Sequence, residues 1–321
     1  SKTQRTSLQH NIAICGCHFL FRSQQKHHKN ANNGRTVMAK QTIIFSDLDG
    51  TLLDHYSYQS TAAQPTLKQL RHAEIPVILN TSKTLAELDI IRAELKLETP
   101  FIIENGAAIY IPINTFKTQP EDTEVFKNYW LKSFCSPRQH WLDLLSQQCE
   151  QFQPYYQGFS TLSNTELCQV TGLDSAQAER AKQRQYGEPV QWFGDEKTKQ
   201  LFVEHLIELG ASVVQGGRFM HIGGYCDKGQ ALIWLTEQYR EHFANSNVYT
   251  IALGDGENDI SMLEAADIAV QVRSPVHDFP PLYQQYKTTQ TQRYGPEGWA
   301  DAIQQLLANQ LSTHLRQSNL V

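Results

Sequence analysis

No apolar run in this sequence of 321 residues approaches the ~20 residues that a helix needs to cross a bilayer. The longest candidate, Asn11 to Phe21, is short and contains Cys, Gly and His. We therefore expect no membrane partner and a cytoplasmic protein. Gly and Pro are not clustered, and a content of 40% hydrophobic and 19% charged residues is ordinary for a globular chain, which excludes extensive disorder.

Cysteine pairs with the spacing of a metal site are also absent. There is no CxxC, and no Cys/His spacing would build a tetrahedral zinc site. Free thiols in a reducing compartment fit this pattern best. A metal or redox feature at the first two cysteines stays open, although their spacing matches no known signature. The six cysteines are Cys15, Cys17, Cys135, Cys149, Cys168 and Cys226.

Acidic residues are missing from positions 1–37, which hold six Lys and Arg residues. The rest of the chain has 22 basic and 33 acidic residues. This acidic body argues against a nucleic-acid partner, because phosphate backbones are bound by Lys and Arg surfaces. We interpret residues 1–37 as a disordered tail without function that precedes the first methionine, Met38. A transit peptide is the alternative, although the segment has no clean amphipathic period.

Apolar strands alternate with helical patterns near both ends of the chain. Thr84 and Glu87 form a capping box at the start of one helix. The alternation predicts an α/β fold with a doubly wound, Rossmann-like parallel sheet that is covered on both faces. The predicted strands are residues 41–45, 75–79, 101–103, 248–253 and 268–272, and the predicted helices are residues 66–73, 84–95, 229–243 and 261–266.

The middle of the chain differs from both ends. With ~100 to 200 residues per domain, 321 residues leave room for a second unit. Short strands, a two-glycine hairpin signal at Gly216-Gly217 and several amphipathic stretches, the first at 121–131, predict an inserted α+β domain. We expect this cap at 113–222 and the core at 38–112 and 223–321, with Gly223-Gly224 as the return hinge.

Two acidic clusters follow predicted strands. Asp47 and Asp49 end the first strand, where ligands of open α/β sheets bind, and Gly50 helps the chain to bend there. Such a pair could supply a nucleophile and a proton donor for phosphoryl transfer. Asp255 and Asp259 follow a later strand, and three carboxylates at one sheet edge suit Mg²⁺. Each cluster alone could also be an ordinary polar turn.

Two further residues could bind phosphoryl oxygens. Thr81 ends the second predicted strand and can donate a hydroxyl hydrogen bond, and Lys228 precedes a helix and can neutralise charge. Taken singly, a strand-end Thr is usually a cap and such a Lys is usually solvated. Their order along the chain, between DLDGT and GDGEND, supports both residues as phosphoryl-binding candidates.

DLDGT, Thr81, Lys228 and GDGEND resemble, in order, the four motifs of the haloacid dehalogenase-like phosphatases. Asp49 argues for a phosphatase, since true dehalogenases lack that second aspartate. Lys228 lies 147 positions after Thr81, which places the insert between the second and third motifs, as in the larger α/β cap type. Longer stretches, including VILNTSKTLAEL, RAKQRQYGEPVQW and GGRFMHIGGYCDKGQAL, resemble the mannosyl-3-phosphoglycerate phosphatase family.

The resemblance implies a role for each motif residue. Asp47 would attack phosphorus, and Asp49 would protonate the leaving oxygen and then activate water. Thr81 and Lys228 would hold the phosphoryl group. Mg²⁺ would be bound by Asp47, Asp255 and the backbone carbonyl of Asp49, with support from Asp259. The expected partner is a small phosphate ester, whose sugar and glycerate could be bound by Lys83, Asn105, Arg184, Glu188 and Arg218.

Two other functions stay open at this point. A phosphatase for another sugar phosphate, such as glucosyl-3-phosphoglycerate, would keep every catalytic residue and differ only in the cap. A non-catalytic sugar-phosphate sensor on the same fold would tolerate loss of Asp47 or Asp49, and both are present here.

Overall fold

The computed structural model describes residues 40–216, 218–243, 247–283 and 287–318. The predicted tail, residues 1–37, and Gly217 of the predicted hairpin lie outside the described residues. All described residues belong to one compact unit, which spans residues 38–321.

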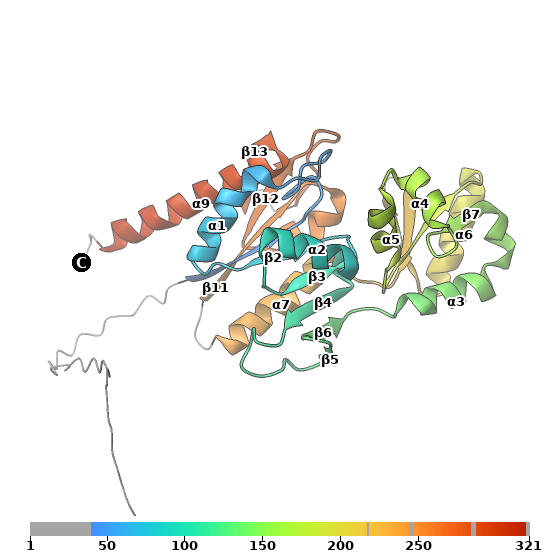
Figure 1. Ribbon diagram of the computed structural model, residues 1–321, viewed down its shortest axis with the longest axis horizontal. Coiled ribbons are helices and arrows are strands. Elements are labelled where there is room, and N and C mark those ends of the chain that lie inside the picture. Colours follow the sequence, from blue (N-terminus) through green and yellow to red (C-terminus); the bar gives the residue numbers. More distant parts are fainter. Residues whose placement is uncertain (1–39, 217, 244–246, 284–286, 319–321) are drawn as a thin grey trace, which may run out of the picture. The chain divides into compact units, whose positions relative to one another are not determined.

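The described residues form two sheets, and the larger has nine strands in the order β13-β12-β11-β1-β2-β3-β4-β6-β5 (Figure 1). Its strands are β1 Lys40–Ser46, β2 Val77–Asn80, β3 Phe101–Ile103, β4 Ala108–Pro112, β5 Glu124–Phe126, β6 Tyr129–Ser133, β11 Asn247–Gly254, β12 Ile268–Arg273 and β13 Thr288–Tyr294. From β13 to β3 all neighbours run parallel, which confirms the predicted α/β core. The sequence did not predict the antiparallel edge formed by β4, β6 and β5.

Helices cover both faces of this sheet because its central strands are apolar on both sides. In β1, Ile44 packs with residues of α1, α2 and α9, whereas Ile43 and Phe45 pack with residues of α7 and α8. The helices are α1 Gln64–His72, α2 Leu85–Leu95, α7 Lys228–His242, α8 Ile260–Ala265 and α9 Gly295–Ser318. The capping box of Thr84 and Glu87 opens α2 as predicted.

The predicted amphipathic stretch at 121–131 is not a helix. Strands β5 and β6 form a hairpin there, and only Lys127 and Asn128 lie between them. Lys127 has a φ of +52°, a value that two-residue hairpin loops need because it matches the twist of the strands. The segment therefore extends the large sheet, although the sequence placed it in the insert, and the second unit begins after Ser133.

The second sheet has four antiparallel strands in the order β7-β8-β10-β9. Its strands are β7 Tyr156–Gly158, β8 Glu188–Trp192, β9 Ser212–Gly216 and β10 Phe219–Gly223, and the helices around it are α3 Arg138–Gln148, α4 Asn164–Thr171, α5 Ser175–Lys182 and α6 Glu196–Glu208. Residues of α3 and α6 share one core cluster with Val190, Met220 and Ile222, while α4 and α5 pack with Phe159 and Phe219. This is the α+β composition that the sequence predicted.

Short 3₁₀ helices occupy several turns, namely η1 Thr61–Ala63, η2 Glu104–Gly106, η3 Glu150–Tyr155 and η4 Glu257–Asp259. Among the described residues, none of the helices combines the length and the apolar character that a membrane span requires.

Candidate active site

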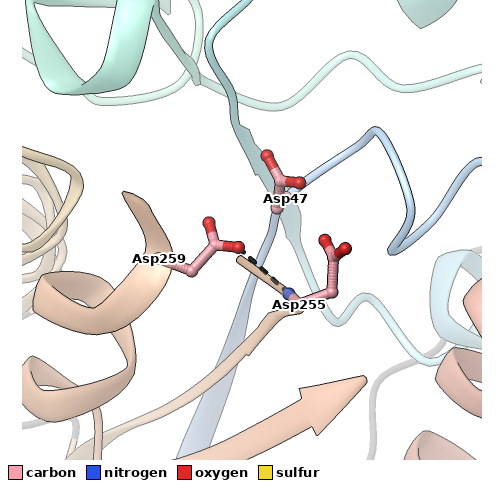
Figure 2. Close-up of side chains that lie close together, drawn as sticks. All are labelled: Asp47, Asp255 and Asp259. Carbon is pink, nitrogen blue, oxygen red and sulfur yellow. Dashed lines mark hydrogen bonds between the residues drawn. The ribbon is translucent and has the colours of Figure 1, made fainter. Parts of the chain in front are cut away.

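Three carboxylates meet at the carboxyl edge of the large sheet. Asp47 follows β1 and Asp255 follows β11, and the two strands pair with Ser46 opposite Leu253. Asp259 ends η4, one turn after Asp255. One oxygen from each carboxylate lies within 4.8 Å of the others, and all three residues are buried (Figure 2). The adjacent strand ends thus bring together acids that are 212 positions apart in the chain.

The turn after β1 depends on Gly50. Its φ is +78°, a region that residues with a side chain rarely adopt. A Cβ atom on Gly50 would lie 2.5 Å from Oδ2 of Asp255, so a side chain there would displace that carboxylate. Glycine therefore allows the turn of the first motif to lie directly against the carboxylate of the second acidic cluster.

Lys228 is the buried cation of this cluster. Its Nζ lies 2.6 Å from Oδ1 of Asp47 and 2.6 Å from Oδ1 of Asp259. It is the first residue of α7, and Nδ2 of Asn80 donates to its backbone carbonyl at 2.9 Å. One ammonium faces three carboxylates, so the cluster carries excess negative charge when all of them are ionised.

The electrostatics of the cluster favour an added cation. Burial and the charge of Asp259 raise the pKa of Asp47 well above its usual range, although Lys228 opposes this shift. Burial and Asp259 also raise the pKa of Asp255. For Lys228, burial disfavours the charged form, but Asp259 and Asp47 outweigh it and raise the pKa. Hard carboxylate oxygens with unbalanced charge are the donor set that a divalent metal ion prefers, so these residues fit such an ion.

Neighbouring groups hold the acids in place. Oγ1 of Thr51 donates to Oδ1 of Asp255 at 2.8 Å, and Nε2 of His277 lies 3.4 Å from its Oδ2. The backbone N–H groups of Asp255 and Gly256 both donate to Oδ2 of Asp259, at 3.0 and 2.9 Å. Thr51 and His277 were not predicted from the sequence, although Thr51 follows Gly50 in the DLDGT motif, which could have identified it.

Two other predicted residues lie on neighbouring segments of the same sheet edge. Thr81 is buried directly after β2, and its Oγ1 accepts from the backbone N–H of Lys83 at 3.3 Å. Asp49 is partly exposed, and its Oδ2 forms an ion pair with Nζ of Lys83 at 2.8 Å. Glu87 also lies close to that ammonium, at 3.7 Å. Burial opposes the charge on Lys83, but Asp49 and Glu87 raise its pKa overall, so it stays protonated and can hold Asp49 in place.

A pocket adjoins the carboxylates and contains two predicted substrate ligands. Asn105, Asn258 and Lys228 line it from the large-sheet side, and Arg184 and His221 line it from the small-sheet side. Nδ2 of Asn258 donates to Oδ1 of Asn105 at 3.1 Å. Burial, with the charge of Arg184, lowers the pKa of His221 to about 4, which leaves its imidazole neutral at pH 7.

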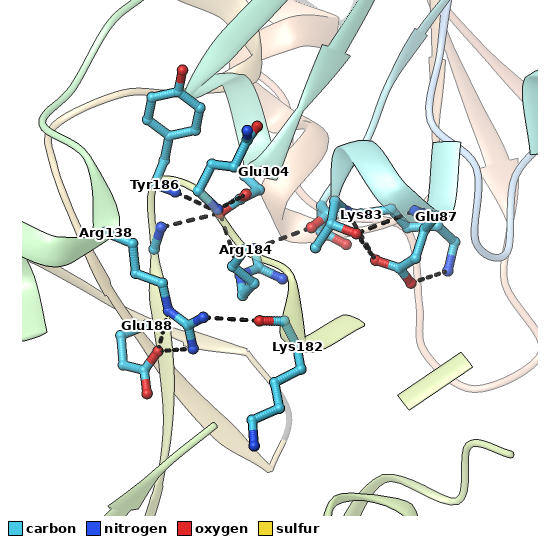
Figure 3. A network of polar contacts seen from close by, with 12 residues as sticks. Lys83, Glu87, Glu104, Arg138, Lys182, Arg184, Tyr186 and Glu188 are labelled. Carbon is cyan, nitrogen blue, oxygen red and sulfur yellow. Dashed lines mark hydrogen bonds and ion pairs between the residues drawn. The ribbon is translucent and has the colours of Figure 1, made fainter. Parts of the chain in front are cut away.

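Glu104 connects the two sheets through its buried carboxylate. Arg184 lies against it with Nε 3.3 Å from Oε2, as Figure 3 shows. The backbone N–H groups of Gln185 and Gly187 donate to Oε1 and Oε2 at 2.7 and 3.0 Å. Glu104 was not predicted from the sequence, and no spacing identifies it because the partners of its carboxylate are 80 or more positions away.

Glu188 and Arg218 make contacts within the second unit. Both carboxylate oxygens of Glu188 are engaged there. Nε of Arg138 donates to Oε2 at 2.6 Å (Figure 3), and the backbone N–H of Ser160 donates to Oε1 at 2.8 Å. Arg218 is exposed and donates to the carbonyl of Thr171 at 3.0 Å. These contacts stabilise the small sheet and α4, and a role of either residue in substrate binding stays a prediction.

A sequence model of the haloacid dehalogenase-like hydrolases matches residues 44–136 and 147–277. This range includes every acid of the cluster as well as Thr81 and Lys228. A haloacid dehalogenase-like hydrolase from B. subtilis has a similar structure, with a TM-score of 0.55 and 21% identity over 82% of this chain and 98% of that one. At that identity the structural likeness supports the fold alone.

Two curated relatives are similar over most of their length. A glucosyl-3-phosphoglycerate/mannosyl-3-phosphoglycerate phosphatase from Methanococcoides burtonii is 39% identical over 83% of this chain and 97% of its own. A protein of the same name from Persephonella marina is 31% identical, again over 83% of this chain and 97% of its own.

Proposed function

The chain belongs to the haloacid dehalogenase-like hydrolases, and from this membership we propose that it is a phosphatase that hydrolyses mannosyl-3-phosphoglycerate through an aspartyl-phosphate intermediate. The main support for this chemistry is the position of the buried Asp47, which lies beside Lys228, Asp255 and Asp259 at the carboxyl edge of the sheet. The names of the two relatives support the substrate class.

The proposed reaction has two steps at the carboxyl edge of the large sheet. A carboxylate oxygen of Asp47 attacks phosphorus, and Asp49 gives a proton to the departing C3 oxygen of the glycerate. Asp49 then takes a proton from the water that attacks the aspartyl phosphate. Lys228 and Thr81 bind the phosphoryl oxygens, and Lys228 already contacts the nucleophile at 2.6 Å.

The metal that we propose is Mg²⁺. Asp47, Asp255 and the backbone carbonyl of Asp49 would bind it, and Asp259 would support it directly or through water. When bound, the ion orients the phosphate and offsets its charge. The excess of carboxylates over ammonium groups in the cluster is the feature of this chain that supports it.

The second unit, residues 134–222, is the proposed cap that selects the substrate. Arg184 and Asn105 line the pocket beside Lys228, so they lie where the glycerate and sugar of a bound ester would extend. Lys83 holds Asp49 and could contact the same ester. Roles for Glu188 and Arg218 in substrate binding stay part of the proposal.

Phosphate release from a panel of esters tests the function. With Mg²⁺, the highest kcat/KM is expected for mannosyl-3-phosphoglycerate, followed by glucosyl-3-phosphoglycerate, with 3-phosphoglycerate and hexose 6-phosphates far lower. A preference for the glucosyl compound would favour the second candidate substrate, which the names of both relatives include. Equal, low rates on all members would contradict the proposed substrate class.

Replacing Arg184 by Ala is expected to raise KM for mannosyl-3-phosphoglycerate by roughly 10- to 100-fold, the effect of losing one charged contact with a carboxylate. The KM for p-nitrophenyl phosphate should change little, because that ester has no glycerate. Steady-state kinetics on both substrates measures the difference. Nη2 of Arg184 also donates to the carbonyl of Ser82 at 3.2 Å, so the melting temperature is recorded alongside.

Arg218→Ala, which removes an exposed guanidinium from the same unit, tests the second predicted arginine in the same way. An equal rise in KM for both variants would give Arg218 the same role as Arg184. Equal losses on the two substrates in Arg184→Ala would instead show that Arg184 supports the fold or the phosphoryl site.

A further inference from the structure

Two thiols lie in contact where the chain passes between the two sheets. Cys135 belongs to the segment that leaves β6 for α3, and Cys226 belongs to the segment that returns from β10 to α7. The Sγ atom of Cys226 donates to the Sγ atom of Cys135 at 3.7 Å, although the residues are 91 positions apart. These two segments are the connections between the core and the proposed cap.

The backbones of the two connections are also close together at this point. A Cβ atom on Gly224 would lie 2.2 Å from Cβ of Cys135, so only glycine permits the approach. Both cysteines line the pocket that contains Arg184 and Lys228, so small oxidants can reach them from the side of the site. A bond between the thiols would join the two connections covalently.

The two sulfurs differ in acidity in a way that suits oxidation. The hydrogen bond from Cys226, aided by the backbone N–H of Gly224, lowers the pKa of Cys135 against the effect of burial. The pKa of Cys226 is raised by that same bond and by burial. By comparison, burial raises the pKa of Cys149 to about 11. Among these three thiols, Cys135 is therefore the one most readily ionised to the nucleophilic thiolate.

We propose that Cys135 and Cys226 are a redox modification site at which a hydroperoxide forms a disulfide that fixes the proposed cap against the core. The Cys135 thiolate attacks the terminal peroxide oxygen and the O–O bond breaks, which gives a sulfenic acid and an alkoxide, or hydroxide when the oxidant is hydrogen peroxide. The leaving alkoxide or hydroxide takes up the proton that Cys135 released on ionisation and becomes an alcohol or water. The Cys226 thiolate then attacks the sulfenic sulfur and displaces hydroxide, which leaves as water with the proton of Cys226. Two thiols lose two electrons in total, and the peroxide gains them.

The expected consequence is a reversible loss of activity. Cap domains open and close around substrates, and a bond across both connections would restrict that motion. The bond would also move two lining residues of the pocket, since the sulfurs must approach from 3.7 Å to the ~2.05 Å of a disulfide. The part of this inference that concerns activity depends on the proposed phosphatase function, whereas formation of the disulfide does not.

The test uses the full chain, first reduced and then treated with hydrogen peroxide. Differential alkylation and peptide mass mapping should find a cross-link between residues 135 and 226. Hydrogen exchange of residues 134–137 and 223–227 should slow after oxidation. The kcat/KM for the sugar phosphoglycerate should fall roughly 10- to 100-fold, because misplacement of groups by about 1 Å can cost that much. Dithiothreitol should restore it.

Single cysteine variants show whether inactivation by peroxide comes from this site or from oxidation elsewhere in the protein. Cys135→Ser and Cys226→Ser should keep their activity in peroxide. Cys168 is a half-buried cysteine of α4, and Cys168→Ser should lose activity in peroxide, as the unchanged protein does. Cys135→Ala provides a second variant if the Ser form has a lowered melting temperature. Absence of the 135–226 cross-link, inactivation that persists in both Ser variants, or a cross-linked protein with unchanged kinetics would overturn the proposal. If the reduced protein is inactive on the sugar substrate but forms the cross-link, the proposed substrate fails and the modification site stands.

Discussion

Asp47→Asn is expected to abolish phosphate release, with a loss on the order of 10⁴-fold or more, as other enzymes show when their nucleophile is removed. The amide has nearly the shape of the carboxylate but cannot form an acyl phosphate. Quenched-flow labelling of the protein with ³²P-labelled substrate measures formation of the acyl phosphate, and steady-state assays measure phosphate release. Substantial turnover by the purified variant would falsify the covalent mechanism.

The same substitution should not destabilise the metal-free protein. The pKa of Asp47 is raised in the folded state by burial and by Asp259, so folding disfavours its charged form. A raised pKa means that Asp47 contributes stability below its unfolded pKa, near pH 4, and that this contribution is lost as pH rises through the folded value. At pH 7 the neutral amide is therefore expected to give an equal or higher melting temperature in the presence of a chelator. Asp89→Asn, an exposed change on α2, is the control.

Removal of divalent metal is the second change with a large expected effect. Chelation should reduce phosphate release to background, and added Mg²⁺ should restore it, because Lys228 alone does not balance three buried carboxylates. Mg²⁺ should also raise the melting temperature, since a ligand at 100 times its Kd stabilises the folded state by about 2.7 kcal/mol. Calorimetry and phosphate assays over a Mg²⁺ series measure both effects.

Asp255→Asn tests whether this site is responsible. The variant should need a much higher Mg²⁺ concentration for half-maximal activity and should lose most of the thermal shift. Glu257→Gln lies in the same loop, but its side chain is exposed, so it should behave as the unchanged protein. Full activity in the chelator, or an unchanged shift in Asp255→Asn, would contradict a metal site at these carboxylates.

The elements with strong local patterns could be predicted from the sequence. The apolar run of β1 is long enough to pack on both faces of a sheet, and it does so through Ile43, Ile44 and Phe45. The capping box of Thr84 and Glu87 fixes the start of α2 by contacts only three residues apart. The acids meet because carboxyl ends of parallel strands share one edge, so Asp47 and Asp255 could be placed together before their distance was known.

The amphipathic pattern at 121–131 did not distinguish a helix from a hairpin. The stretch at 121–131 mixes apolar and polar residues in a way that fits a short helix as well as a hairpin. The segment forms strands because β6 pairs with β4, and this pairing is a long-range contact. The same pairing moves the start of the second unit from residue 113 to the end of β6.

By itself, the sequence determined the α/β core, the order of the four motifs and which acids meet at the sheet edge, because each depends on residues close in the chain or on the rule that strand ends share an edge. Only the tertiary structure decided which side chains support them. The carboxylate of Glu104 accepts hydrogen bonds from residues 81 and 83 positions away, both carboxylate oxygens of Glu188 are engaged within the second unit, and Cys135 meets Cys226 across 91 positions. Such contacts arise from packing between distant segments, and no local period or spacing encodes them.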